Sequence, residues 1–155
     1  MSYITLSFPF NVCEDIACKL FSTAWLFKIA THRLLRITQE MSYLPSTDIG
    51  WKNEFREIIY KIIPNRRYTD GVIVLVRSIY ESCRELSIDF KSVELNNWLM
   101  FQQVEKEYPC RCFTLKKSEY FTFHITTIDY FGKTHRVIIK PTVSKTYKVL
   151  LEKNS

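Results

Sequence analysis

The stretch Tyr120–Ile128, YFTFHITTI, decides the fold class of this 155-residue chain. Aromatic and aliphatic residues alternate with threonine and histidine along it, which is the two-residue period of a strand with one apolar face. The sequence DYFG at Asp129–Gly132 predicts a turn, and Thr134–Lys140 predicts the return strand. Lys145–Glu152 alternates in the same way and predicts a third strand, so the C-terminal third is expected to form an antiparallel sheet.

The pattern in the first two-thirds of the chain is helical instead. Asn11 and Glu14 form a capping pair at the start of a helix that reaches about residue 39. Amphipathic periodicity predicts a second helix over 51–63 and a third over 69–87. A shorter helix is expected between Ser92 and Glu107, and a strand over the first ten residues. We therefore predict one α+β domain over 1–155, with an N-terminal helical two-thirds packed on a C-terminal antiparallel sheet.

Composition and charge limit the kinds of partner that we expect for this chain. Hydrophobic residues make up 46% and charged residues 25% of the chain, which is typical of a globular protein. Lys and Arg number 22 against 16 Asp and Glu, and a net charge of +6 attracts polyanions such as nucleic acid. The alternative is a merely basic surface without a specific partner.

Cysteine usage and hydropathy bear on the compartment. Five cysteines, an odd count without a signal peptide, predict buried thiols in a reducing, cytoplasmic compartment. No apolar run reaches the roughly 18 residues of a membrane span, so no membrane partner is expected. Phosphate loops, dinucleotide fingerprints and zinc-ligand spacings are all missing from the sequence, and no organic cofactor is predicted.

Candidate catalytic residues lie on the third predicted helix. Glu81 and Glu85 are four residues apart, so their carboxylates share one helical face and could hold a divalent ion such as Mg²⁺. Arg77 and Arg84 flank them and could contact phosphates. The alternative is a solvated helix face with ordinary ion pairs between neighbours.

Two further basic groups are candidates for nucleic-acid binding. Arg66 and Arg67 form a basic turn before the third helix, where guanidinium groups and backbone N–H groups suit a phosphate, with Tyr68 as a stacking surface or hydroxyl donor. Lys116 and Lys117 lie in the β region, where tyrosines are interleaved with lysines. A solvated loop and a lysine-protected sheet edge are the respective alternatives.

The remaining polar residues have structural interpretations. Asp48, Asp70 and Asp89 are expected at helix caps or helix ends, and Asp129 in the turn of the hairpin. The three histidines include His124 on the polar side of its strand, and ordinary surface or packed histidines are expected because no second histidine follows at ligand spacing.

The run Ile63–Gly71 (IPNRRYTDG), which leads into a helix with Glu81 and Glu85, resembles the small nucleases of archaeal filamentous viruses of the lipothrixvirus type. That resemblance implies an α+β nuclease that cuts linear double-stranded DNA and depends on one glutamate. Glu85 is the matching position, with Glu81 next, and the host cytoplasm is the implied location.

A second similarity is to the N-terminal region of archaeal transposon-associated TnpB proteins. It rests on a helical bundle, a segment like Tyr108–Thr114, and strands such as Tyr120–Pro141. That region grips guide RNA and DNA. The chain lacks the RuvC-like carboxylates and the zinc-binding cysteines of those proteins, so this resemblance implies binding without cleavage.

Three functions follow from these patterns. The first is a DNA nuclease that uses Glu85 and Glu81. The second is a nucleic-acid-binding protein without catalysis, which would use the same arginines and the lysine-rich sheet. The third is a protein-interaction module that docks a partner on an aromatic surface including Trp51 and Trp98.

Overall fold

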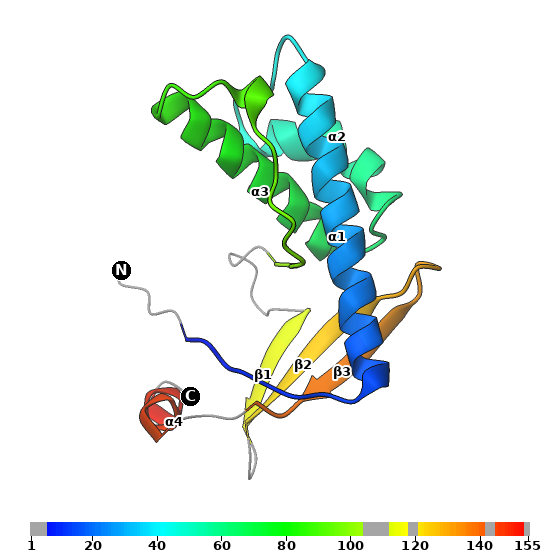
Figure 1. Cartoon of the computed structure of the whole chain (residues 1–155), viewed down its shortest axis with the longest axis vertical. Helices are drawn as coiled ribbons and strands as arrows, with labels where there is room; N and C mark the ends of the chain where they lie inside the picture. Colours follow the sequence, from blue (N-terminus) through cyan, green and yellow to red (C-terminus); the bar gives the residue numbers. More distant parts are fainter. Residues whose placement is uncertain (1–5, 104–111, 118–120, 142–144, 154–155) are drawn as a thin grey trace.

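A computed structural model describes residues 6–103, 112–117, 121–141 and 145–153. Three long helices come first in the chain, and a small sheet and a short helix follow (Figure 1). In order, the elements are α1 (Glu14–Glu40), α2 (Asp48–Tyr60), α3 (Arg66–Glu85), the 3-10 helix η1 (Phe90–Ser92), β1 (Phe113–Lys117), β2 (Phe121–Ile128), β3 (Thr134–Ile139) and α4 (Lys145–Lys153).

The helices begin at residues that satisfy their first N–H groups. Thr47 accepts a hydrogen bond from the Gly50 N–H at the start of α2, and Asn65 accepts one from Tyr68 at the start of α3. The N-cap of α1 is Cys13, whose side chain makes no capping bond, so the predicted capping pair at Asn11 is wrong although the helix is confirmed.

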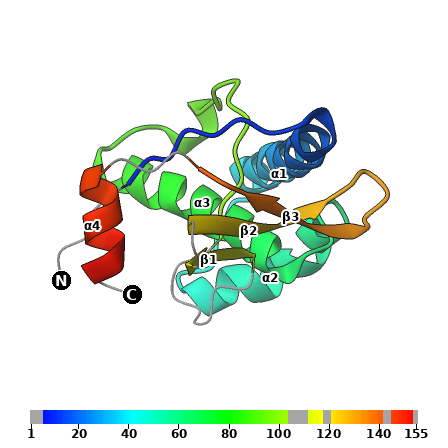
Figure 2. The same ribbon diagram turned by 90° about the horizontal axis from the view of Figure 1, so that it is seen from below.

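The sheet is antiparallel, with the order β1-β2-β3. Phe113 pairs with Ile125, which pairs in turn with Val137 on β3. The three strands lie side by side in Figure 2, with α4 at the opposite end from the β2–β3 turn. The predicted α+β class, with N-terminal helices packed on a C-terminal antiparallel sheet, is confirmed.

The helices share a core that reaches the sheet. Trp51, Phe55 and Tyr68 are fully buried between the three long helices, together with Cys112 and Ile128 from the β region. A second apolar cluster forms between the inner face of the sheet and the start of α1, and the side chains of Phe101 and Phe113 pack against both clusters. Burial of this apolar surface joins the helices to the sheet.

Polar contacts reinforce the same junction. The Ser22 hydroxyl on α1 donates to the Ile128 carbonyl at 2.7 Å, and the Ile128 N–H donates to the Thr23 hydroxyl at 2.8 Å. The Tyr68 hydroxyl donates to the Thr126 carbonyl. Because all of these groups are buried, their pairing avoids a large desolvation penalty.

Three predicted elements are corrected by the structure. Residues 6–10 form no strand, while 1–5 lie outside the described residues. Residues 93–103 form no helix, and 104–107 are not described. The backbone carbonyl of Val93 accepts a hydrogen bond from the Gln39 side chain at 2.9 Å. The predicted third strand is the helix α4, whose Tyr147 packs on the Phe8 ring at 5.5 Å.

The predicted aspartate roles hold in three cases of four. Asp48 opens α2, Asp89 caps η1, and Asp129 accepts N–H bonds in the hairpin turn. Asp70 is instead a buried residue inside α3, where both of its carboxylate oxygens accept hydrogen bonds from Arg56 at 2.8 and 2.9 Å. This bidentate pair joins α2 to α3.

Candidate nucleic-acid interface

One side of the three-stranded sheet carries polar and basic side chains, and we call it the outer face. Directly paired residues in an antiparallel sheet point to the same side, so Thr114, His124 and Ile138 form one row across it. The opposite side packs against α1 through Ile125 and Val137. The outer face consists of Thr114, Lys116, Thr122, His124, Arg136 and Ile138, all of them exposed or half-buried.

Arg136 is held across this face by hydrogen bonds to two other strands. Its Nη1 donates to the Thr126 hydroxyl on β2 at 3.0 Å, and its Nη2 donates to the Thr114 hydroxyl on β1 at 2.9 Å. The side chain remains exposed. A guanidinium fixed in this way has already lost most of its rotamer freedom, so it can contact an anion at a lower entropic cost than a free arginine.

The positive charges of the outer face affect the pKa of His124. Desolvation lowers its pKa below the ordinary value, and the positive charges of Lys116 and Arg136 lower it further. Its Nε2 lies 3.3 Å from the Thr122 hydroxyl. The imidazole is therefore neutral at pH 7, and it can exchange hydrogen bonds with a phosphate or a sugar without adding charge.

The basic residues before the third helix lie within its first turn, where we expected a loop. Asn65 is the N-cap, Arg66 is exposed, and Arg67 is half-buried. Tyr68 is fully buried, so it cannot act as a stacking surface, and its hydroxyl is used internally. The first N–H groups of α3 and two guanidinium groups therefore occupy the same end of the helix.

The start of α3 and the outer face adjoin each other at Cys112. Burial raises the pKa of the Cys112 thiol, against the opposing effects of Asn65, of Tyr68 and of the guanidinium groups of Arg67 and Arg136. The two arginines, from α3 and β3, thus both lie near one buried thiol. We call Arg67, Lys116, His124 and Arg136 together the basic surface.

The candidate catalytic carboxylates lie at the other end of α3. Glu81 is fifteen residues after Arg66, and at the helical rise this places it roughly 22 Å away along the axis. Glu81 contacts Arg84 at 3.8 Å, and Glu85 is exposed. Among the described residues there is no group of three His, Cys, Asp or Glu side chains that could hold a metal ion.

Arg77 is engaged in a contact between helices. Its Nη1 lies 3.5 Å from the Asp48 carboxylate, and its Nη2 donates to the Ser46 carbonyl at 3.3 Å. Arg77 follows Arg67 on the basic surface by roughly 15 Å along the axis of α3, and Arg84 follows it by roughly 25 Å. The described residues do not bring the four predicted arginines together with the two glutamates.

The structure adds Arg136 to the candidates that the sequence named. The alternation over residues 134–140 placed it on the same side of its strand as Thr134, but only the register shows that it lies beside Thr126. Lys116 is exposed on the outer face, whereas the side chain of Lys117 lies outside the described part of the chain.

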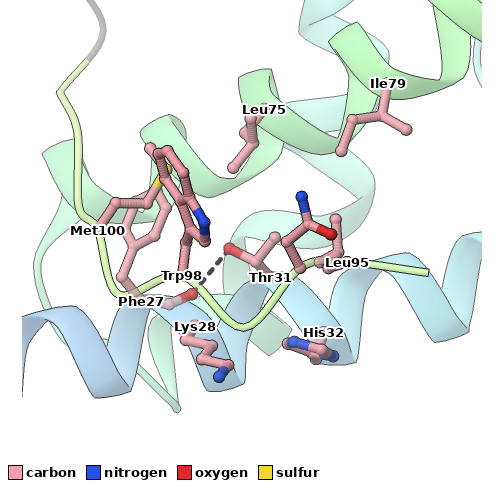
Figure 3. A pocket seen from close by; sticks show the side chains of 10 residues that line it. Phe27, Lys28, Thr31, His32, Leu75, Ile79, Leu95, Trp98 and Met100 are labelled. Atoms are coloured by element: carbon pink, nitrogen blue, oxygen red, sulfur yellow. Dashed lines mark hydrogen bonds between the residues drawn. The ribbon is translucent and has the colours of Figure 1, made fainter.

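A second surface is apolar. A cavity of about 230 Å³ lies between α1 and α3, lined by Phe27, Leu75 and Ile79 and covered by Trp98 and Met100 (Figure 3). The Thr31 hydroxyl on its wall already donates to the Phe27 carbonyl at 2.7 Å. Trp98 is 76% exposed, as a docking surface requires, but Trp51 is 0% exposed and belongs to the core, so its predicted part in a docking surface is wrong.

No helix among the described residues has the length and apolar content to cross a membrane. No family model matches the chain. No solved structure matches it either. Two proteins of Aeropyrum pernix, each described only as an uncharacterized protein, are 63% identical to it over 153 residues, or 99% of the chain. The chain spans 41% of the length of one of these relatives and 36% of the other.

Proposed function

We propose that this chain is a nucleic-acid-binding module that holds a phosphate backbone on its basic surface and does not itself cleave it. The observation that carries the proposal is that basic side chains from three elements share neighbours where α3 meets the sheet: Lys116 and Arg136 lie near His124, and Arg67 and Arg136 lie near Cys112. Backbone phosphates are recognised by such clusters of Lys and Arg together with hydroxyl donors.

Charge placement favours this function over the nuclease hypothesis. The nuclease hypothesis requires a carboxylate, or a metal ion that it holds, at the phosphate that the arginines bind. Glu81 and Glu85 are separated from Arg66 and Arg67 by at least fourteen residues of one helix, or roughly 21 Å. A duplex could span that distance, yet its scissile phosphate would then lie near Arg84, which already contacts Glu81 at 3.8 Å.

Two further findings support a binding module. The resemblance to the N-terminal region of TnpB implies binding without cleavage. The greater length of the Aeropyrum pernix relatives accommodates further activities in other parts of those proteins. We also propose a cytoplasmic location, where free thiols stay reduced. Among the described cysteines the predicted burial is right for Cys83 and Cys112 and wrong for Cys13 and Cys18, which are exposed.

Fluorescence anisotropy with labelled DNA and RNA oligonucleotides tests binding. We expect the double variant Lys116→Gln/Arg136→Gln to lose at least tenfold in affinity at low salt. The control Arg36→Gln/Arg84→Gln removes the same charge from exposed positions away from the sheet and should bind like the native chain. Equal losses of affinity in both double variants would show that binding depends on net charge and not on the basic surface.

The same samples test cleavage. The native chain incubated with linear duplex DNA and Mg²⁺ should leave the DNA intact over hours. Cleavage that Glu85→Ala abolishes would establish the nuclease hypothesis and overturn the proposed function.

A further inference from the structure

The turn between β2 and β3 carries two aromatic side chains that the described part of the chain leaves largely exposed. Tyr130 is 63% exposed and Phe131 is 98% exposed. Hairpin turns ordinarily carry Gly, Asn, Asp and other polar residues, and a phenylalanine in water forgoes all of the stabilisation that burial would give it. Its presence at this position is therefore not explained by folding.

The turn is rigid despite this exposure. The Asp129 carboxylate accepts hydrogen bonds from the N–H groups of Phe131 and Lys133, both at 2.9 Å, and lies 2.9 Å from His135 Nε2. The Gly132 N–H donates to the Asp129 carbonyl at 3.0 Å, with Gly132 at φ +83°. The backbone that presents Phe131 is thus fixed before any ligand arrives.

The turn also sits beside positive charge. A Cβ added to Gly132 would lie 3.2 Å from Pro64 Cγ, so the turn packs directly on the connection that leads into α3. Arg66 follows Pro64 by two residues and Lys133 follows Gly132, and both are exposed. Figure 1 shows the turn at the end of the sheet nearest the helices, projecting past α1.

We propose that Phe131 and Tyr130 form a stacking site for unpaired nucleotide bases, so that the partner is a single-stranded nucleic acid or a junction that contains one. This inference rests on the proposed function. Aromatic side chains beside a basic backbone path are the arrangement that single-strand-binding surfaces use, because every base has a face on which a ring can stack. In an intact duplex those faces are covered by neighbouring base pairs.

The residues that flank the two rings indicate which class of molecule binds there. An apolar partner protein would meet two exposed aromatics flanked by Lys133 and by the connection that leads to Arg66. Those cations would lose hydration on an apolar surface without a counter-charge. A nucleic-acid strand offers both parts at once, since its bases can contact the rings while its phosphates contact the cations.

The test uses the full chain with single-stranded and duplex oligonucleotides of equal length, some carrying 2-aminopurine. We expect the native chain to bind the single strand more tightly than the duplex and to quench 2-aminopurine emission. Tyr130→Ala/Phe131→Ala should weaken single-strand binding about tenfold and abolish quenching, with duplex binding unchanged. Phe131→Trp should keep the affinity, and its indole emission should change when the single strand binds.

Tyr43→Ala is the matched control, because Tyr43 is also an exposed aromatic, 78% exposed, but lies in the connection between α1 and α2. It should behave as the native chain does. Near-native thermal unfolding of the hairpin variants is expected since the removed rings are exposed.

The outcomes separate the two proposals. If the native chain binds nucleic acid with steep salt dependence and the hairpin variant binds single strands equally well, stacking is refuted and the proposed function stands. If the native chain binds neither form in low salt, both are refuted.

Discussion

Substituting Gly71 by alanine tests how the segment before the sheet packs on α3. In an ordinary helix interior this change stabilises the protein by about 1 kcal/mol, because glycine has a high conformational entropy in the unfolded chain. Here an added Cβ would lie 2.4 Å from the Gln102 carbonyl oxygen and 3.5 Å from the Phe27 ring. That carbonyl would have to move by roughly 1 Å to reach a normal van der Waals separation.

Such a movement affects more than one contact. Gln102 donates from its side chain to the Gly71 carbonyl at 3.3 Å, and the neighbouring Phe101 ring packs on Tyr68 and Phe113 at centroid distances of 5.6 and 5.8 Å. Overpacking of this kind costs about 1–3 kcal/mol. Because displacing Phe101 disturbs both apolar clusters, we take the upper part of that range and expect a net loss of about 1–2 kcal/mol.

Urea unfolding and thermal unfolding measure this effect. A loss of that size corresponds to a fall in Tm of about 2–8 °C for a chain of this length. Ser78→Ala on the exposed side of the same helix serves as the control, with an expected gain of a few tenths of a kcal/mol. A Gly71→Ala variant at least as stable as the native chain would mean that residues 101–103 do not pack on α3 as described.

Three other substitutions address the remaining contacts. Tyr68→Phe should cost about 1–3 kcal/mol in urea unfolding, because the buried carbonyl of Thr126 loses its donor; an unchanged midpoint would show that water replaces the hydroxyl. Asp70→Asn should cost about 1–3 kcal/mol of unfolding free energy. This is less than the loss of a fully buried ion pair, because Arg56 is partly exposed and can be hydrated again. If the two residues act as a pair, Asp70→Asn should cost nothing further in an Arg56→Met variant. Hydrogen bonds from His135 and the turn backbone hold the pKa of Asp129 below its ordinary value of 3.8. The ionised carboxylate therefore stabilises the folded chain above pH 3.8, and this stabilisation is lost as the pH falls through the lower pKa of the folded state. The protection factors of the turn amides, which correct for the intrinsic pH dependence of exchange, should therefore fall at acidic pH in the native chain but show no such step in Asp129→Asn.

The periodic elements of this fold could be predicted from sequence because burial repeats at fixed intervals. The stripe that includes Val72, Val76 and Cys83 is buried along α3 as its spacing indicates, and the β2–β3 hairpin follows from alternation and a turn signal. Short segments were less informative. In residues 145–153 the apolar positions 147, 150 and 151 fit a helical face as well as a strand, and the structure has a helix there.

The candidate site could be predicted only in part, because its residues meet through tertiary contacts. Local charge in the sequence identified Arg66, Arg67 and Lys116. That Arg67 and Arg136 both lie near Cys112 depends on where α3 meets the sheet. Glu81 and Glu85 share a helical face as their spacing requires. What spacing could not show is that this end of α3 is far from the basic surface, or that Arg56 and Asp70 pair across two helices.

The salt dependence of nucleic-acid affinity tests the basic surface most directly. If Arg67, Lys116 and Arg136 each neutralise one phosphate, the slope of log K against log salt on duplex DNA is about −2.7, and raising salt from about 50 to about 200 mM weakens binding about 40-fold. Removing Arg136 alone by substitution with glutamine should reduce the slope to about −1.8 and the loss to about 12-fold. Arg84→Gln should leave the slope unchanged. A native slope near zero, or equal slopes for native and Arg136→Gln, would contradict the assignment of this surface to nucleic acid.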